Sequence, residues 1–247
     1  MTENTNSNTQ KWYASWFDTP FYHILYKDRD YQEAQHFMDN ITSYLNLPDE
    51  AKILDLACGK GRHSIYLNSL GYDVTGADLS ENSITEAKKW ENESLHFKVH
   101  DMRNKCKDKY DAIFNLFTSF GYFENDADNL TTLKAIHSSL TDTGFACIDF
   151  MNVDNVIENL VPEETKTVEN IDFHIKRYVK DNHIFKEIDF TFEEEKYHFT
   201  EKVQALRLAD FEQMMEEAGI YLLDIFGNYK LQKFFKNQSE RLIMIFK

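Results

Sequence analysis

The sequence has few cysteines, and their arrangement excludes two common classes of small domain. Only three cysteines occur in 247 residues, Cys58, Cys106 and Cys147. Their number is odd, they are widely spaced, and no C-x-x-C pair is present. Disulfide frameworks and structural zinc sites need paired cysteines, so we expect reduced thiols in a reducing compartment.

Positive charge and long apolar runs are scarce as well. The chain has 27 lysines and arginines against 42 aspartates and glutamates, a formal net charge of −15. A surface of this sign repels a phosphate backbone, so we expect no nucleic-acid partner. No stretch approaches the roughly 20 apolar residues of a membrane span, and residues 1–10 lack the basic and apolar regions of a signal peptide. We therefore expect a cytoplasmic protein without a membrane partner.

The sequence contains instead a regular alternation of short apolar runs and helical segments. Apolar runs at 53–57, 74–77, 95–99, 112–117 and 145–150 predict strands, and the segments near 62–70, 83–91 and 128–140 predict helices between them. A helix is expected over 31–45, another near 209–219, and two last strands at 221–226 and 241–246. Alternation at this spacing is typical of a mostly parallel sheet covered on both faces.

Between 162 and 207 the pattern changes to period two. Candidate strands at 171–179, 183–192 and 197–206 predict an inserted three-stranded antiparallel sheet. The fold class expected is therefore α/β, with a doubly wound, seven-stranded, mostly parallel sheet, a helical N-terminal cap and this insert. We expect a single compact unit with four parts: leader and cap (1–50), cofactor-binding core (51–152), insert (153–207) and the end of the core (208–247).

The segment 53–64 carries the first functional signal. It is an apolar strand that runs into a glycine turn and opens a helix. Gly59 and Gly61 allow a close backbone approach to a ligand, and the helix N-terminus favours an anionic ligand group. Asp78 ends the next strand, where a carboxylate can accept hydrogen bonds from both ribose hydroxyls. A dinucleotide site is the alternative, but Ser64 stands where its fingerprint has a third glycine, and about fifty residues precede the turn.

Ordered motifs add a family resemblance. Residues 55–61, Asp-Leu-Ala-Cys-Gly-Lys-Gly, resemble the first motif of class I S-adenosylmethionine-dependent methyltransferases, with Ala57 where the family often has glycine. Residues 76–80, 100–103 and 110–117 resemble the second, third and fourth motifs, and 140–145 stands where the family has a turn. The cap and insert resemble a bacterial small-molecule subgroup. The resemblance implies a Rossmann-like fold, S-adenosylmethionine as cofactor, and methyl transfer to a small-molecule N or O acceptor.

The resemblance also implies roles for residues at the strand ends. Asp55 and the backbone of 57–61 would hold the aminocarboxypropyl group, Asp78 the ribose hydroxyls, and Asp101 the adenine amino group. The candidate set adds three residues that the resemblance does not give. Tyr22 and Tyr26 of the aromatic cap either attract the sulfonium or pack on the core, and His63 either faces the cofactor or is a solvated or capping residue. The full cofactor-binding set is Tyr22, Tyr26, Asp55, Ala57, Cys58, Gly59, Gly61, His63, Asp78, Leu79, Ser80, Asp101, Met102, Asn115, Leu116 and Phe117.

Four further residues are candidates for the acceptor side. Tyr13 in the aromatic cap either faces the ligands or packs on the core, and Thr118 and Tyr122 follow the fourth motif. Strand alternation places Arg177 among apolar neighbours, where a guanidinium needs an anionic partner. That partner is either a substrate anion or Glu201, which alternation places on the apolar face of the candidate strand 197–206, and we favour Glu201.

Methyl transfer from a sulfonium requires positioning rather than a dedicated nucleophile or metal, so no catalytic residue is assigned. His96 and His100 lie four apart on a predicted strand, whereas metal-ligand spacing of this kind needs a helix.

Segment 115–122 lacks the Asn/Asp-Pro-Pro-Tyr/Phe signature of enzymes that methylate bases. The alternatives left open are a non-catalytic cofactor-binding regulatory protein and a dinucleotide-dependent oxidoreductase.

Overall fold

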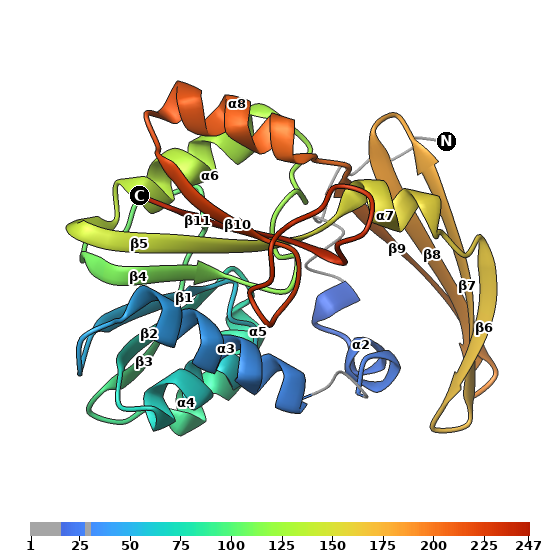
Figure 1. The fold of residues 1–247 in the computed structure, drawn as a ribbon. Coiled ribbons are helices and arrows are strands. Elements are labelled where there is room, and N and C mark those ends of the chain that lie inside the picture. The colour runs from blue at the N-terminus through green and yellow to red at the C-terminus, as the bar shows by residue number, and fades with distance from the viewer. Residues whose placement is uncertain (1–15, 28–30) are drawn as a thin grey trace, which may run out of the picture.

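The main layer of the molecule is a seven-stranded sheet (Figure 1). The computed structural model describes residues 16–27 and 31–247. The strand order is β10-β11-β5-β4-β1-β2-β3, and β11 alone runs in the opposite direction to the other six strands. The strands are β1 Lys52–Leu56, β2 Asp73–Asp78, β3 Leu95–Val99, β4 Tyr110–Asn115, β5 Leu140–Met151, β10 Leu222–Phe226 and β11 Arg241–Phe246. The predicted doubly wound, mostly parallel sheet is confirmed.

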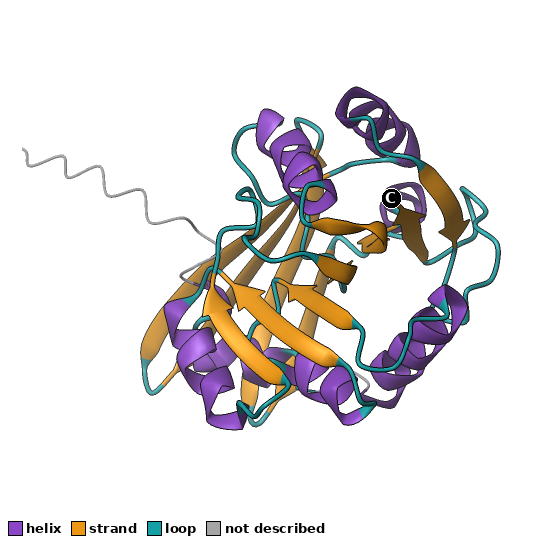
Figure 2. Ribbon diagram, turned by 90° about the vertical axis from the view of Figure 1, so that its left-hand side faces the viewer, coloured by secondary structure: helices purple, strands orange, loops and turns teal. Residues whose placement is uncertain are grey.

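Helices cover both faces of this sheet because its strands are apolar on both sides (Figures 1 and 2). Ile53 of β1 belongs to the core cluster under α3, α4 and α5, whereas its neighbour Leu54 belongs to the cluster under α6 and α8. The same alternation holds at Ala112 and Ile113 of β4. The helices are α3 Tyr31–Leu45, α4 Arg62–Ser69, α5 Glu81–Ala87, the 3₁₀ turn Lys88–Trp90, α6 Ala127–His137 and α8 Leu208–Ala218.

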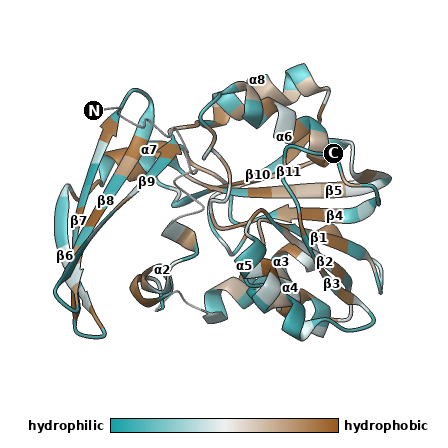
Figure 3. Cartoon of the chain, turned by 180° about the vertical axis from the view of Figure 1, so that it is seen from behind, coloured by the Kyte–Doolittle hydropathy of each residue, from teal (hydrophilic) through white to brown (hydrophobic). Residues whose placement is uncertain are grey.

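A second, four-stranded antiparallel sheet lies beyond the carboxyl ends of the core strands, with α2 between the two sheets (Figure 1). It packs against the N-terminal segment in a third core cluster that includes Trp16, Leu25 and Phe173. The colouring in Figure 3 shows hydrophobic residues alternating with hydrophilic ones along its strands. Its elements and the short helices beside it are α2 Pro20–Leu25, α7 Val153–Glu158, β6 Glu163–Val168, β7 Ile171–Lys180, β8 His183–Phe192 and β9 Glu195–Gln204.

The insert therefore has one strand more than the three that the sequence predicts. The additional strand, β6, pairs only with β7 and forms an edge of the sheet. Its sequence, Glu-Glu-Thr-Lys-Thr-Val, is polar because five of its six residues are exposed or half-buried. A charged edge strand protects a sheet against pairing with other chains, but it lacks the apolar alternation that reveals a strand in a sequence.

The segment expected to be a turn after α6 is part of β5 instead. Leu140 pairs with Tyr110, whereas Phe145 pairs with Ala112, so the intervening residues form a bulge. Gly144 lies in this bulge, and a Cβ there would come within 2.8 Å of the carbonyl oxygen of Tyr110. Glycine thus lets the strand bulge where a turn was predicted. The division of the chain into four parts stays a prediction.

One aromatic ring fixes how closely β2, β3 and the first glycine turn approach. A Cβ on Gly61 or on Gly76 would lie 2.5 Å from the ring of Phe97. We expect Gly76→Ala to lower the free energy of unfolding by about 1–3 kcal/mol, the usual range for overpacking a core. Urea denaturation measures this loss. In a Phe97→Leu background the same change should cost less, and an equal cost in both backgrounds would contradict this packing account.

Candidate functional site

A cavity of about 520 Å³ lies where the carboxyl ends of the core strands face the insert. Open parallel sheets bind ligands at this edge, and the volume suits a small organic ligand. The cavity is bounded by three parts of the chain: the strand ends, the N-terminal segment with α2, and β9 of the insert. The site is therefore composite, and each part contributes a different chemistry.

The turn after β1 lines the cavity with Ala57, Cys58, Gly59 and Lys60. It is held by Ala57 and Cys58, whose N–H groups donate to the carbonyl oxygen of Ala77 at 2.7 and 3.1 Å. Ala57, Gly59 and Gly61 all have left-handed φ angles, +66°, +55° and +80°. Ala57 thus occupies a conformation that glycine adopts without strain, which explains why a glycine is common at this place in the family that the sequence resembles.

Asp78 connects this turn to the end of β2. One carboxylate oxygen accepts a hydrogen bond from Gly59 N and the other from Ser80 N, both at 2.8 Å. Each oxygen keeps a further lone pair for a ligand hydroxyl. Burial is the main cause that raises the pKa of Asp78 above its ordinary value, partly offset by these two hydrogen bonds.

Asp55 is the most deeply buried acid of the cavity wall. It is 3% exposed, and its carboxylate accepts a hydrogen bond of 2.6 Å from the Ser64 hydroxyl. Burial raises the pKa of Asp55 to about 6, and the nearby charge of Asp78 adds to the effect, whereas the bond from Ser64 opposes it. A buried carboxylate of this kind gains from a cationic ligand.

Arg103 organises the end of the cavity that follows β3. Its guanidinium binds Asp101 at 2.5 Å and Asp128, at the start of α6, at 2.8 Å. His100 also lines the cavity, and burial is the main cause that lowers its pKa. The loop after β3 is thereby held to α6.

The loop after β4 is held by a buried ion pair. Arg241 on β11 binds Asp149 on β5 at 2.8 Å and donates to the Thr118 hydroxyl at 2.9 Å. Asp149 is fully buried and accepts a hydrogen bond from Phe117 N at 2.8 Å. Phe117 and Thr118 have left-handed φ angles of +58° and +61°. Non-glycine residues adopt this conformation only when the surroundings enforce it, and the ion pair provides that enforcement.

The wall opposite the strand ends is aromatic, and β9 adds a carboxylate to it. Rings follow one another from Tyr122 to Phe17 at 5.7 Å, to Tyr22 at 5.0 Å and to Tyr26 at 4.8 Å. The Tyr26 hydroxyl donates to Glu201 of β9 at 2.7 Å. On the core side, His63 stacks on Phe117 at 4.4 Å.

The structure brings most of the sequence-predicted site residues together, although their role in binding stays a prediction. Asn115 is buried away from the cavity, where its amide donates to the carbonyl oxygen of Leu56. Gly61 lies behind the turn against Phe97, and Tyr13 is outside the described residues. The predicted residues that line the cavity are Tyr22, Tyr26, Asp55, Ala57, Cys58, Gly59, His63, Asp78, Leu79, Ser80, Asp101, Met102, Leu116, Phe117, Thr118 and Tyr122.

Arg177 is placed differently from the expectation. Its guanidinium binds Glu164 of β6 at 2.5 Å, and the favoured pair with Glu201 is not formed. The register explains this, because Lys186 of β8 lies directly between Arg177 and Glu201. Arg177 is not among the residues that line the cavity.

Sequence reasoning missed several residues of the site. Phe17 and Asp18 line the cavity, and Asp18 accepts a hydrogen bond of 2.5 Å from the Ser80 hydroxyl. Their sequence signal was the aromatic N-terminal segment, which was interpreted through its tyrosines alone. Asp149 and Arg241 lie in apolar strands with no motif to identify them.

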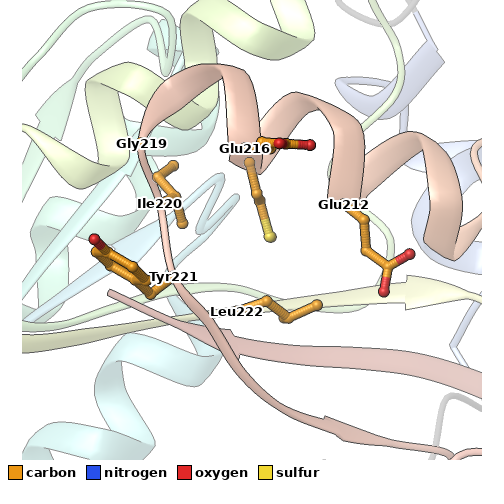
Figure 4. A pocket seen from close by; sticks show the side chains of 7 residues that line it. Glu212, Glu216, Gly219, Ile220, Tyr221 and Leu222 are labelled. Carbon is orange, nitrogen blue, oxygen red and sulfur yellow. The ribbon is translucent and has the colours of Figure 1, made fainter.

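A second hollow of about 560 Å³ lies at the surface between the end of α8 and the start of β10 (Figure 4). Figure 4 shows the carboxylates of Glu212 and Glu216 at its rim, with Ile220 and Leu222 below. It lies away from the carboxyl ends of the core strands and carries none of the motif residues.

The comparisons with known proteins agree with the geometry. Residues 53–144 match the family model described as a methyltransferase domain. The chain is 25% identical over 219 residues to the putative methyltransferase YqeM of Bacillus subtilis, covering 81% of this chain and 88% of that protein. It is 32% identical over 133 residues to a Streptomyces venezuelae dTDP-3-amino-3,4,6-trideoxy-alpha-D-glucopyranose N,N-dimethyltransferase, covering 52% of this chain and about half (54%) of that protein.

A solved structure shows the same fold. The S-adenosylmethionine-dependent methyltransferase from Clostridium acetobutylicum superposes with a TM-score of 0.76 at 22% identity, over 91% of this chain and 94% of that one. Among the described residues no helix is long and apolar enough to cross a membrane. The cytoplasmic location stays a prediction.

The raised pKa of Asp55 predicts that its carboxylate strengthens cofactor binding but lowers the free energy of unfolding. The folded state holds the Asp55 proton more tightly than the unfolded state, so stability is lost as pH rises from about 4 through about 6. We expect Asp55→Asn to be more stable than the natural chain at pH 7.5, by about 1–3 kcal/mol, with the difference vanishing near pH 4. The same variant should bind S-adenosylhomocysteine more weakly. Urea denaturation and calorimetry measure the two effects.

The exposed Asp142 provides the matched control, since Asp142→Asn should change neither quantity. A variant at Asp55 that loses stability at pH 7.5 would refute the proposed cost of its buried charge.

The Arg241–Asp149 pair predicts a large loss on removal of one partner. We expect Arg241→Met to lower the free energy of unfolding by about 3–5 kcal/mol, because it leaves the Asp149 carboxylate buried and uncompensated. Arg207, which pairs with Asp154 at 3.0 Å and is 41% exposed, is the control. Arg207→Met should cost no more than about 1 kcal/mol. Equal losses in urea denaturation would show that burial of the Arg241 pair has no special effect.

Proposed function

We propose that the chain is an S-adenosylmethionine-dependent methyltransferase, with residues 53–144 as its methyltransferase domain, and that it methylates a nitrogen atom of a small-molecule amine. The observation that carries this proposal is the composite cavity, in which a glycine turn and acidic strand ends face an aromatic wall across one space. The strand ends suit the cofactor, and the wall suits the acceptor.

The residues at the strand ends fit the cofactor in charge and in hydrogen bonding. The start of α4, which has no side-chain cap, offers backbone N–H groups that suit a carboxylate. Asp78 has acceptor capacity for the ribose hydroxyls, and Asp55 has a buried carboxylate that suits an ammonium or sulfonium charge. In this proposal Asp101 and Met102 border the adenine at the end of β3.

The bound cofactor supplies an electrophilic methyl group on sulfur. S-adenosylmethionine would give this methyl group to a neutral acceptor nitrogen and would leave as S-adenosylhomocysteine, and the methylated nitrogen would take over the positive charge. The protein contributes by alignment and by exclusion of water. His63 and Phe117 form the core-side wall, and the rings of Phe17, Tyr22 and Tyr26 close the opposite side.

The charge of the cavity supports a nitrogen acceptor. Five carboxylates line it, Asp18, Asp55, Asp78, Asp101 and Glu201, against three cationic side chains, Lys27, Lys60 and Arg62. Such a lining attracts amines, which are cationic in water, more than alcohols. The Streptomyces relative is also named as an N,N-dimethyltransferase.

Transfer of labelled methyl groups tests the proposal. The chain is incubated with S-adenosylmethionine carrying a tritiated methyl group and with matched panels of small amines and alcohols. We expect label in amine products, and calorimetry should show saturable S-adenosylhomocysteine binding. Absence of binding would overturn the proposal, and binding without transfer to any amine would support a regulatory protein instead.

Two aspartates at opposite ends of β2 give a matched pair for the cofactor site. Asp78→Asn should weaken S-adenosylhomocysteine binding about tenfold to a hundredfold, because charge-assisted hydrogen bonds to the ribose become neutral ones. Asp73, at the amino end of the strand, does not line the cavity, so Asp73→Asn should leave the affinity unchanged. Equal affinities in the two variants would contradict the assignment of the ribose to Asp78.

A further inference from the structure

Glu201 is the one acid that the insert contributes to the cavity among the described residues. Two donors from the N-terminal segment, Trp16 Nε1 and the Tyr26 hydroxyl, bind it at 2.7 Å each. Both bonds end on the same oxygen, Oε1. Within the described part of the chain Oε2 accepts no hydrogen bond and forms no ion pair, so this oxygen keeps its capacity for a ligand. The two bonds hold the carboxylate in one orientation.

The rings beside Glu201 complete a site for a cation. Tyr26 and Tyr22 line the same cavity at a ring separation of 4.8 Å, and Phe17 and Tyr122 continue the row. Ring faces attract onium groups, and a carboxylate beside them adds a full negative charge. Neither element resembles a site for a phosphate, which needs arginines, lysines or clustered N–H groups.

Neither of the two nearby lysines, Lys186 and Lys27, forms an ion pair with the Glu201 carboxylate. Lys186 lies opposite Glu201 in the sheet, but its ammonium bonds to the Tyr26 hydroxyl and lies 4.5 Å from the centre of that ring. Lys186 is not among the residues that line the cavity. Lys27 does line it, and its ammonium pairs with Glu169 at 3.2 Å.

We propose that Glu201 and the ring row from Tyr122 to Tyr26 bind the acceptor as a small ammonium ion that carries no phosphate. This inference rests on the proposed function and specifies its acceptor end. The acceptor nitrogen enters in its charged form and releases a proton to water before the transfer. Its methylated product is again an ammonium and fits the same site.

Paired probes that differ only in charge test this site. Choline presents a trimethylammonium group, and 3,3-dimethylbutan-1-ol presents the same shape with a neutral carbon. Both are titrated calorimetrically into the protein saturated with S-adenosylhomocysteine. We expect choline to bind at least tenfold more tightly than the alcohol. Equal affinities, or no binding of choline, would overturn the proposal.

Variants of β9 assign the effect to one carboxylate. Glu201→Gln should remove most of the preference for choline, whereas Glu201→Asp, which keeps the charge, should retain part of it. Glu195, exposed at the start of the same strand, gives the control, and Glu195→Gln should behave as the natural chain. An unchanged preference in Glu201→Gln would refute the role of Glu201.

Binding of S-adenosylhomocysteine separates this failure from failure of the proposed function. All three variants should bind it as tightly as the natural chain, which also shows that they are folded. If the natural chain does not bind it, the methyltransferase proposal itself fails. If the natural chain binds it but shows no preference for choline, or if Glu201→Gln keeps the full preference, only the acceptor site is wrong.

Discussion

The buried ion pair between Arg241 and Asp149 is the constraint on which the shape of the cavity depends. It joins the last strand of the chain to β5 and, through Phe117 N and the Thr118 hydroxyl, to the loop after β4. That loop bends through two left-handed residues, which a free chain would avoid. Because Asp149 is fully buried, the pair is stable only while both partners and their hydrogen bonds are present. Arg241, which is 123 positions beyond Thr118 in the chain, thus fixes the loop that forms the wall beside the glycine turn.

Features with a local signal were the ones that the sequence predicted well. Helical periodicity over 31–45 and strand alternation over 183–192 have the predicted bounds, because each pattern reflects burial of one face against a neighbour. The glycine turn was located for a similar reason. Left-handed φ angles at Gly59 and Gly61 follow from residue type within a few positions, and Asp78 follows from the end of one strand. The residues of the cofactor half of the cavity can therefore be predicted from short segments of the sequence.

Features that depend on pairing between distant segments could not be derived in this way. Strand β6 is polar because it forms a sheet edge, so nothing in its own residues indicates a strand. The alternation of apolar residues placed Arg177 and Glu201 on the same face of the insert, and the register agrees. Alternation does not, however, indicate which strands are neighbours. Lys186 on the intervening strand separates the two, and Glu164 from the unexpected strand takes the arginine. Glu201 was singled out, but for the wrong partner.

The same division between local and distant contacts separates the two halves of the site. The turn and strand ends that suit the cofactor come from one continuous region, residues 53–118. Related proteins can therefore share all of them within one continuous segment. The opposite wall combines residues 16–26 with Glu201, about 180 positions apart, through the hydrogen bonds of Trp16 and Tyr26. A substitution in either segment alters that wall without disturbing the core sheet. Acceptor specificity can therefore change while the cofactor site stays the same, which is the physical reason why the motifs identify the cofactor more readily than the acceptor.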